Sequence, residues 1–201
     1  MPNTAVTPMR HRSRARSTSS WHSRVDHPDD QAARLALITE LHAIRANAGL
    51  ERHHVTDRYP QLGYPPISAK ALFVIEASTN WQIRTLQTLA RMYDRRLHLD
   101  VVGLTVPDDG DPLAAMYAAM RPANPAAADE LAREVLVRDL ARIRKDLGLS
   151  LQTVGGRLGV SAQAVALWEA CSPGVHLASV QRHTRVLGGR LGISLQTLEG
   201  A

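Results

Sequence analysis

The chain contains two diverged copies of one segment, and this internal repeat limits the folds open to it more than any other feature. Three stretches align in the same order in both halves: LHAIRANAGL (41–50) with LARIRKDLGL (140–149), ISAKALFVIEAS (67–78) with VSAQAVALWEAC (160–171), and IRTLQTLARMYDRRLHL (83–99) with LASVQRHTRVLGGRLGI (177–193). The offset is 99 in the first stretch, 93 in the second and 94 in the third, so the first copy carries about six extra residues between Leu50 and Ile67. A repeat at this spacing predicts one supersecondary unit used twice.

Length and composition exclude several classes of protein. The 201 residues leave room for two small domains but not for a large multi-domain enzyme. No stretch approaches the ~18 apolar residues that would span a membrane, and no secretory signal is expected. The single cysteine, Cys171, excludes an internal disulfide and a multi-cysteine zinc site, so a reducing cytoplasm is the expected location.

Charge is distributed unevenly along the chain. Residues 1–25 hold five arginines and no acidic residue, residues 31–99 and 131–201 each carry a net charge of +4, and residues 100–130 carry −5. Two basic blocks, separated by an acidic segment and preceded by a basic arm, indicate two surfaces for a polyanion such as nucleic acid.

Apolar periodicity predicts helices and no strands. A helix is expected from Asp30 to Gly49 and another from Pro125 to Gly148, while no alternating strand pattern is recognised. The chain is therefore predicted to be all-α. It divides into a disordered basic arm (1–28), a first domain (29–100), an acidic connector (101–123) and a second domain (124–201).

The segment LQTVGGRLGVSAQAVALWE (151–169) has the pattern of a helix-turn-helix. Gly155 is small where two helices must cross closely, and Gly159 stands at the turn, where a positive φ is tolerated by glycine. Ser161 is placed to cap the second helix. The apolar positions between them are spaced to bury both helices against a third.

Residues 140–195 resemble the helix-turn-helix domain of the Cro and phage-repressor type (the XRE family), and residues 41–99 resemble it less closely. The resemblance covers about 115 residues. It implies two tandem lambda-repressor-like helix-turn-helix domains, each of five helices, whose third helix enters the DNA major groove. It also implies sequence-specific operator binding, usually as a dimer and usually for repression.

The same resemblance assigns DNA-contacting positions. The base-reading residues open the third helices, near 68–76 and 161–169: Ser68, Ala69, Lys70 and Val74 in the first copy, and Ser161, Ala162, Gln163 and Leu167 in the second. Lys70 suits guanine or a phosphate, and Gln163 suits adenine. Phosphate contacts are expected from Arg52, His53, Asn80, Gln82 and Arg84 in the first copy and from Gln152 and His176 in the second.

Two further features qualify these assignments. Glu76 and Glu169 occupy equivalent sites near the ends of the third helices, where a fold-supporting hydrogen bond is expected because a carboxylate facing phosphate is repelled. The extra residues of the first copy place Pro60, Pro65 and Pro66 where the tight turn belongs, so its second helix is expected to end early.

The sequence therefore predicts a cytoplasmic, nucleoid-associated regulator of transcription, acting as a repressor, with double-stranded DNA as its partner. It predicts no enzymatic activity, no metal and no cofactor. Because the two reading helices differ, one chain is expected to span two half-sites arranged asymmetrically or as a direct repeat. The sequence leaves open whether the chain forms a homodimer and whether it binds a protein partner. The alternative function is a protein-interaction or antitoxin-type module on a degenerate helix-turn-helix scaffold, with its apolar recognition faces turned to a partner.

Overall fold

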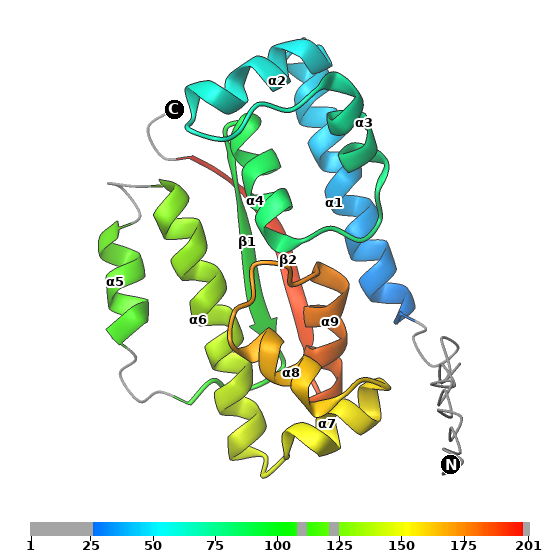
Figure 1. Cartoon of the computed structure of the whole chain (residues 1–201), viewed down its shortest axis with the longest axis vertical. Coiled ribbons are helices and arrows are strands. Elements are labelled where there is room, and N and C mark those ends of the chain that lie inside the picture. The colour runs from blue at the N-terminus through cyan, green and yellow to red at the C-terminus, as the bar shows by residue number, and fades with distance from the viewer. Residues whose placement is uncertain (1–25, 108–111, 121–124, 199–201) are drawn as a thin grey trace, which may run out of the picture.

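The computed structural model describes residues 26–107, 112–120 and 125–198, so the predicted disordered arm, apart from residues 26–28, lies outside the described residues (Figure 1). The elements follow the chain in this order: α1 (Pro28–Asn47), α2 (Arg52–Gln61), α3 (Ala69–Ala77), α4 (Ile83–Met92), β1 (Arg95–Val102), α5 (Pro112–Met120), α6 (Pro125–Asp146), α7 (Leu151–Leu158), α8 (Ala162–Glu169), α9 (Leu177–Val186) and β2 (Arg190–Thr197). Four helices and a strand thus recur in the same order in each half, with α5 between them.

The local signals explain the helix-turn-helix geometry of α7 and α8. Ser161 accepts a hydrogen bond from the backbone N–H of Ala164 at 3.1 Å and so caps α8. Gly159 ends α7 with a φ of +67°, as expected for the turn. In the first half, α2 extends through Pro60 to Gln61, so the expectation that it ends early is wrong. Pro60 has no N–H to donate to the carbonyl four residues earlier, so it removes one helical hydrogen bond without ending the helix.

The all-α prediction is wrong because β1 and β2 form a two-stranded antiparallel sheet. Leu97, Leu99 and Val101 alternate with polar residues, which is the pattern of a strand with one covered face. The register pairs Leu99 with Ile193, which are equivalent positions of the two copies. Each strand therefore finds its hydrogen-bonding partner only in the other half of the chain.

The tandem arrangement of two lambda-repressor-like domains joined by an acidic connector is not confirmed either. A single hydrophobic core includes buried residues of both halves, such as Leu41 and Leu86 with Leu140 and Leu177. The strand β1 crosses the expected boundary at residue 100. That segments 29–100 and 124–201 are separate domains stays a prediction.

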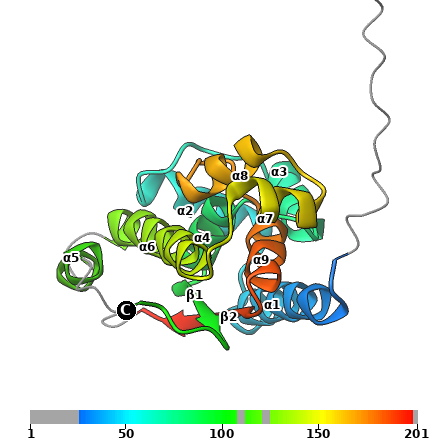
Figure 2. The ribbon, with the colours of Figure 1, turned by 90° about the horizontal axis from the view of Figure 1, so that it is seen from below.

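The long helix that opens each half lies against the fourth helix of the other half. Figures 1 and 2 show α1 beside α9 and α6 beside α4. Gln181 of α9 donates from Nε2 to the backbone oxygen of Asp30 at 3.1 Å and accepts from the Arg34 guanidinium. The same contacts recur at the equivalent positions: Gln87 Nε2 donates to the Asp129 backbone oxygen at 2.6 Å, and Arg133 Nη1 donates to Gln87 Oε1 at 3.2 Å.

Reciprocal backbone hydrogen bonds relate the two halves by an approximate two-fold axis. The N–H of Ile83 donates to the oxygen of Val175 at 3.1 Å, and the N–H of Leu177 donates to the oxygen of Trp81 at 2.8 Å. These are equivalent pairs in the two copies, as expected for an isologous contact. The chain thus has the internal symmetry of a dimer within one polypeptide.

Close packing of α7 on α8 gives a first testable prediction. A Cβ on Gly155 would lie 2.8 Å from the backbone oxygen of Val160, whereas a Cβ on Gly156 would meet nothing within 4 Å. We expect Gly155→Ala to destabilise the protein by about 1–3 kcal/mol, because backbone must move. Gly156→Ala is the matched control and should stabilise the helix by up to about 1 kcal/mol. Urea denaturation measures both, and equal effects would contradict the close approach.

Candidate nucleic-acid interface

The start of α8 is exposed, as a DNA-reading helix requires. Ser161, Gln163 and Leu167 are exposed and Ala162 is half-buried, whereas Val165 is fully buried in the core. The apolar side of α8 is therefore fixed against the fold, and its first turn presents Gln163 to solvent.

The start of α3 is exposed in the same way. Ser68 caps the helix by accepting from the N–H of Ala71 at 3.1 Å. Ser68, Ala69 and Lys70 are exposed, while Leu72 is fully buried. Both candidate reading helices thus turn their N-terminal residues outward.

The two candidate reading helices lie on one side of the molecule. Figure 2 shows α2, α3, α7 and α8 on the side opposite to β1 and β2. Because the halves are related by an approximate two-fold axis, α3 and α8 occupy equivalent places on this side. We call the surface formed by α2, α3, α7 and α8 the helical face.

The segments before α4 and α9 meet each other at the two-fold axis. Gln82 and His176 form an isolated antiparallel bridge, and His176 Nδ1 lies 3.3 Å from the backbone oxygen of Asn80. Asn80 and Gln82 are exposed, and His176 is half-buried. The structure therefore brings together three of the expected phosphate-contacting residues and uses their backbone to join the halves.

Among the remaining candidates, some side chains are exposed to solvent and one is held by contacts within the fold. Gln152 is exposed on α7 and Arg84 is exposed on α4. His53 is exposed, with its Nδ1 3.3 Å from a carboxylate oxygen of Glu51. Arg52 donates from Nε to Glu76 at 2.8 Å, and its guanidinium lies 5.0 Å from the centre of the Phe73 ring, so its orientation is set by the fold.

The two equivalent glutamates form ion pairs inside the fold, which confirms their expected structural role. Glu169 accepts two hydrogen bonds from Arg144, at 2.6 and 2.8 Å. Glu76 is buried, with Arg45 Nε at 3.0 Å and the Tyr93 hydroxyl donating at 2.9 Å. Burial and the contact with Glu76 raise the pKa of Tyr93.

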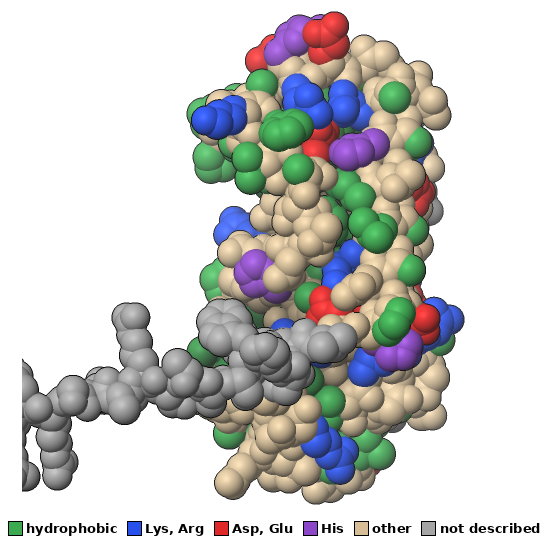
Figure 3. All heavy atoms as spheres, turned by 90° about the vertical axis from the view of Figure 1, so that its right-hand side faces the viewer, with side chains coloured by type: hydrophobic (Ala, Val, Ile, Leu, Met, Phe, Trp, Pro, Cys, Tyr) green, Lys and Arg blue, Asp and Glu red, His purple; other side chains and the backbone are tan. Residues whose placement is uncertain are grey.

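Charge on the molecule is mixed rather than gathered into one basic surface on the side that Figure 3 shows. Lys and Arg side chains there alternate with acidic and histidine side chains, and apolar side chains lie between them. Electrostatic attraction to nucleic acid would depend on local residues of the helical face more than on a continuous basic patch.

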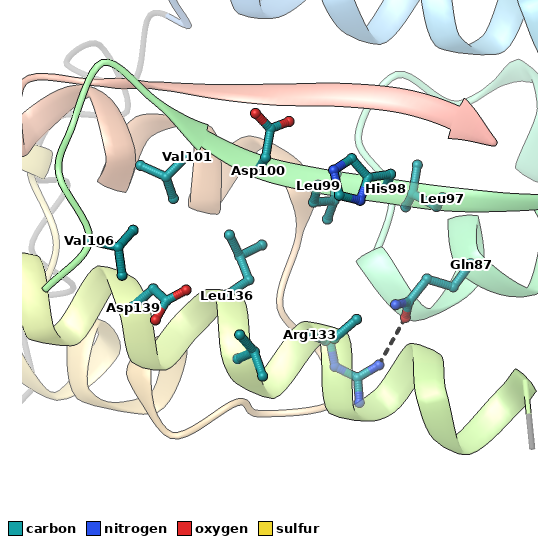
Figure 4. Close-up of a pocket in the computed structure, with 12 residues that line it drawn as sticks. Gln87, Leu97, His98, Leu99, Asp100, Val101, Val106, Arg133, Leu136 and Asp139 are labelled. Atoms are coloured by element: carbon teal, nitrogen blue, oxygen red, sulfur yellow. Dashed lines mark hydrogen bonds between the residues drawn. The ribbon is translucent and has the colours of Figure 1, made fainter. Parts of the chain in front are cut away.

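A cavity of about 310 Å³ lies between β1 and α6, away from the helical face (Figure 4). Its wall is largely apolar, with Leu97, Leu99 and Leu136 among the lining side chains. Arg133 and Gln87 meet at one end through their hydrogen bond, so these polar groups serve the packing of α6 against α4. Nearby, burial raises the pKa of Asp129, although Arg91 and Arg96 act in the opposite direction.

Among residues 26–107, 112–120 and 125–198, no three His, Cys, Asp or Glu side chains are grouped to hold a metal ion. No helix in the part of the chain that the structure describes is long and apolar enough to cross a membrane.

The residues that join the halves were missed by sequence reasoning. Asp30, Arg34 and Gln181 are identical to their equivalents in the other copy, Asp129, Arg133 and Gln87, and this identity was the available signal. Polar residues retained in both copies at helical spacing indicate a shared contact. In the sequence analysis the repeat is used instead to predict the reading helices near 68–76 and 161–169.

Comparison with known proteins gave no match: no family model, no curated protein and no solved structure is significantly similar to this chain. The resemblance to the Cro and phage-repressor type therefore stays a prediction based on the residues quoted above.

Proposed function

We propose that the protein binds double-stranded DNA sequence-specifically and regulates transcription, with α3 and α8 as its two reading helices. The observation that carries the proposal is the outward exposure of both helix starts on one face, at places related by an approximate two-fold axis. DNA itself has local two-fold symmetry, and two-fold related helices are the arrangement that contacts successive major grooves.

The internal symmetry refines the form of the expected DNA site. Because equivalent segments meet in antiparallel fashion at Gln82 and His176 and at Leu99 and Ile193, the half-sites should be inverted rather than directly repeated. Lys70 and Gln163 stand at equivalent positions but favour different bases. The proposed operator is therefore an imperfect inverted repeat with unlike halves, bound by one chain.

Substitutions on the helical face test this proposal. Sites are first selected from a random duplex pool, and affinities are then measured by fluorescence anisotropy. We expect Lys70→Ala and Gln163→Ala each to cost about 1–3 kcal/mol and to relax base preference in different halves of the site. Arg190→Ala is the control, because it removes a positive charge from exposed Arg190 on β2, on the sheet side. If Arg190→Ala weakens binding as much as Lys70→Ala, binding is a matter of total charge and the proposal fails.

A second candidate function is supported by exposed apolar side chains on the same helices. Phe73, Val74 and Leu167 are 52%, 59% and 53% exposed, so these helices present large apolar side chains to solvent beside the candidate reading residues. A protein-interaction or antitoxin-type module would use them to contact a partner protein. Salt separates the two functions: affinity for DNA should fall steeply between about 50 and 200 mM salt, whereas an apolar contact should not weaken.

A further inference from the structure

The first half contains a cavity of about 340 Å³ that is separate from the β1–α6 cavity. It lies between the C-terminal end of α2, the segment 62–68, and the adjoining sides of α3 and α4. Its wall is formed by two threonines of α4 together with Tyr59, Tyr64, Pro65, Ile67, Ile75 and Arg84. A smaller, more polar hollow of about 230 Å³ adjoins it and shares Tyr64 and Arg84.

The apolar wall of this cavity is held in place by the fold. Tyr59 is buried, and its ring meets that of Tyr64 edge-on, with the ring centres 6.3 Å apart. The N–H of Tyr64 donates to the backbone oxygen of Tyr59 at 2.8 Å, which closes the turn after α2. A preformed apolar hollow binds a ligand with little loss of conformational entropy.

Arg84 supplies an uncommitted positive charge at the rim. It is exposed in the first turn of α4, and its guanidinium has no ion-pair or hydrogen-bond partner within residues 26–107, 112–120 and 125–198. The arginines nearby differ: Arg52 and Arg45 are held by Glu76, and Arg58 donates to Asp94 at 2.6 Å. A free guanidinium beside an apolar hollow is complementary to a carboxylate with an apolar body.

Comparison of the two copies shows that the shared fold does not require these features. Ile75 and Arg84 correspond to Trp168 and Ala178 in the second half, and the segment carrying Tyr64 lies within the extra residues of the first half. The second half makes the same helices without them. Because these wall residues occur in one copy alone and the shared helices form without them, a ligand explains the apolar hollow better than stability does.

We propose that this cavity binds a small organic carboxylate with an aromatic or branched aliphatic body, whose carboxylate pairs with Arg84. Its volume is at the lower end of the range of about 300–1,000 Å³ that is usual for small-molecule sites. The N-terminal segment 1–25 is a poor occupant, because its five arginines and lack of acidic residues would repel Arg84.

Calorimetry of the full chain without DNA tests the proposal, with benzoate, 3-phenylpropionate and 4-methylpentanoate as probes. We expect at least one carboxylate to bind, and we expect the affinity of its neutral amide to be lower by a factor of about ten or more. Arg84→Gln should remove this preference and leave the affinity for the amide unchanged. Ile75→Trp, which introduces the residue of the second half, should fill the cavity and abolish binding of both. Arg157→Gln is the control, because it removes an equally exposed charge from α7 and should change nothing.

Several outcomes would overturn the proposal. These are the absence of binding by every probe up to about 5 mM, equal binding of carboxylate and amide, or unchanged binding in a folded Ile75→Trp variant. A large gain in affinity on removal of residues 1–25 or 199–201 would show that a segment of the chain itself occupies the cavity, which also contradicts the proposal. Because no DNA is present, a chain that binds the carboxylate through Arg84 but does not bind DNA would overturn only the proposed function.

Discussion

Replacing Glu169 with alanine is expected to destabilise the protein by about 3–5 kcal/mol, the largest effect that we predict for a single substitution. Arg144 is 7% exposed and donates to Glu169 from both Nε and Nη2. The truncation would leave this guanidinium buried with only its contact to the backbone oxygen of Leu149, at 2.7 Å. A buried charge without its counter-ion costs more than the pair contributes when intact.

Equilibrium denaturation in urea measures this effect, with Glu40→Ala as the control. Glu40 is exposed on α1, so its removal should change the free energy of unfolding by less than about 0.5 kcal/mol. A loss below about 1 kcal/mol for Glu169→Ala would show that water reaches Arg144 in the variant. The ion pair would then contribute to specificity and not to stability.

Stability is also expected to fall by about 3 kcal/mol as the pH is lowered from 6.5 to 4, because of His183. This side chain is 2% exposed, and burial lowers its pKa from 6.5 to about 4, although the nearby Glu169 carboxylate acts in the opposite direction. Below pH 6.5 the unfolded chain takes up a proton that the folded chain does not, so the free energy of unfolding decreases. The loss is complete only below pH 4, where the folded chain is also protonated at His183.

The first half of the chain indicates which residue should replace His183 in a test of this prediction. The residue of the first half that is equivalent to His183 is Leu89, which is also fully buried. In His183→Leu the part of the pH dependence between 6.5 and 4 that belongs to this side chain should disappear, while carboxylates elsewhere keep theirs. Urea midpoints measured at several pH values decide the matter. An unchanged slope in His183→Leu would show that His183 is not the responsible group.

The candidate reading residues could be found from the sequence because their signals are local. Ser161 caps α8 as expected, Ser68 at the equivalent position caps α3, and Gly155 and Gly159 stand where two helices approach and turn. Capping and glycine geometry act within one or two helical turns, so they can be predicted from a short segment of the sequence. The cavity beside Arg84 could not be found in this way, because its wall comes from three helices and a connecting segment.

The two strands show why the rest of the fold escaped sequence reasoning. The stretch RRLHLDVV does alternate, but the segment RLGISLQT includes Gly192 and gives a weaker pattern, and neither is predicted to be a strand. A strand is stable only beside a partner, and here the partner lies about ninety residues away in the other copy. Local pattern does not specify that pairing.

By itself the sequence determined that one unit occurs twice, that a long helix opens each copy, and that the starts of α3 and α8 face outward. Only the tertiary structure decided that the copies interlock, with α1 on α9, α6 on α4 and one strand from each in a common sheet. The reason is physical. Helix signals are satisfied by near neighbours in the chain, whereas strand edges and buried arginines such as Arg34 and Arg133 need partners that folding brings from the opposite half.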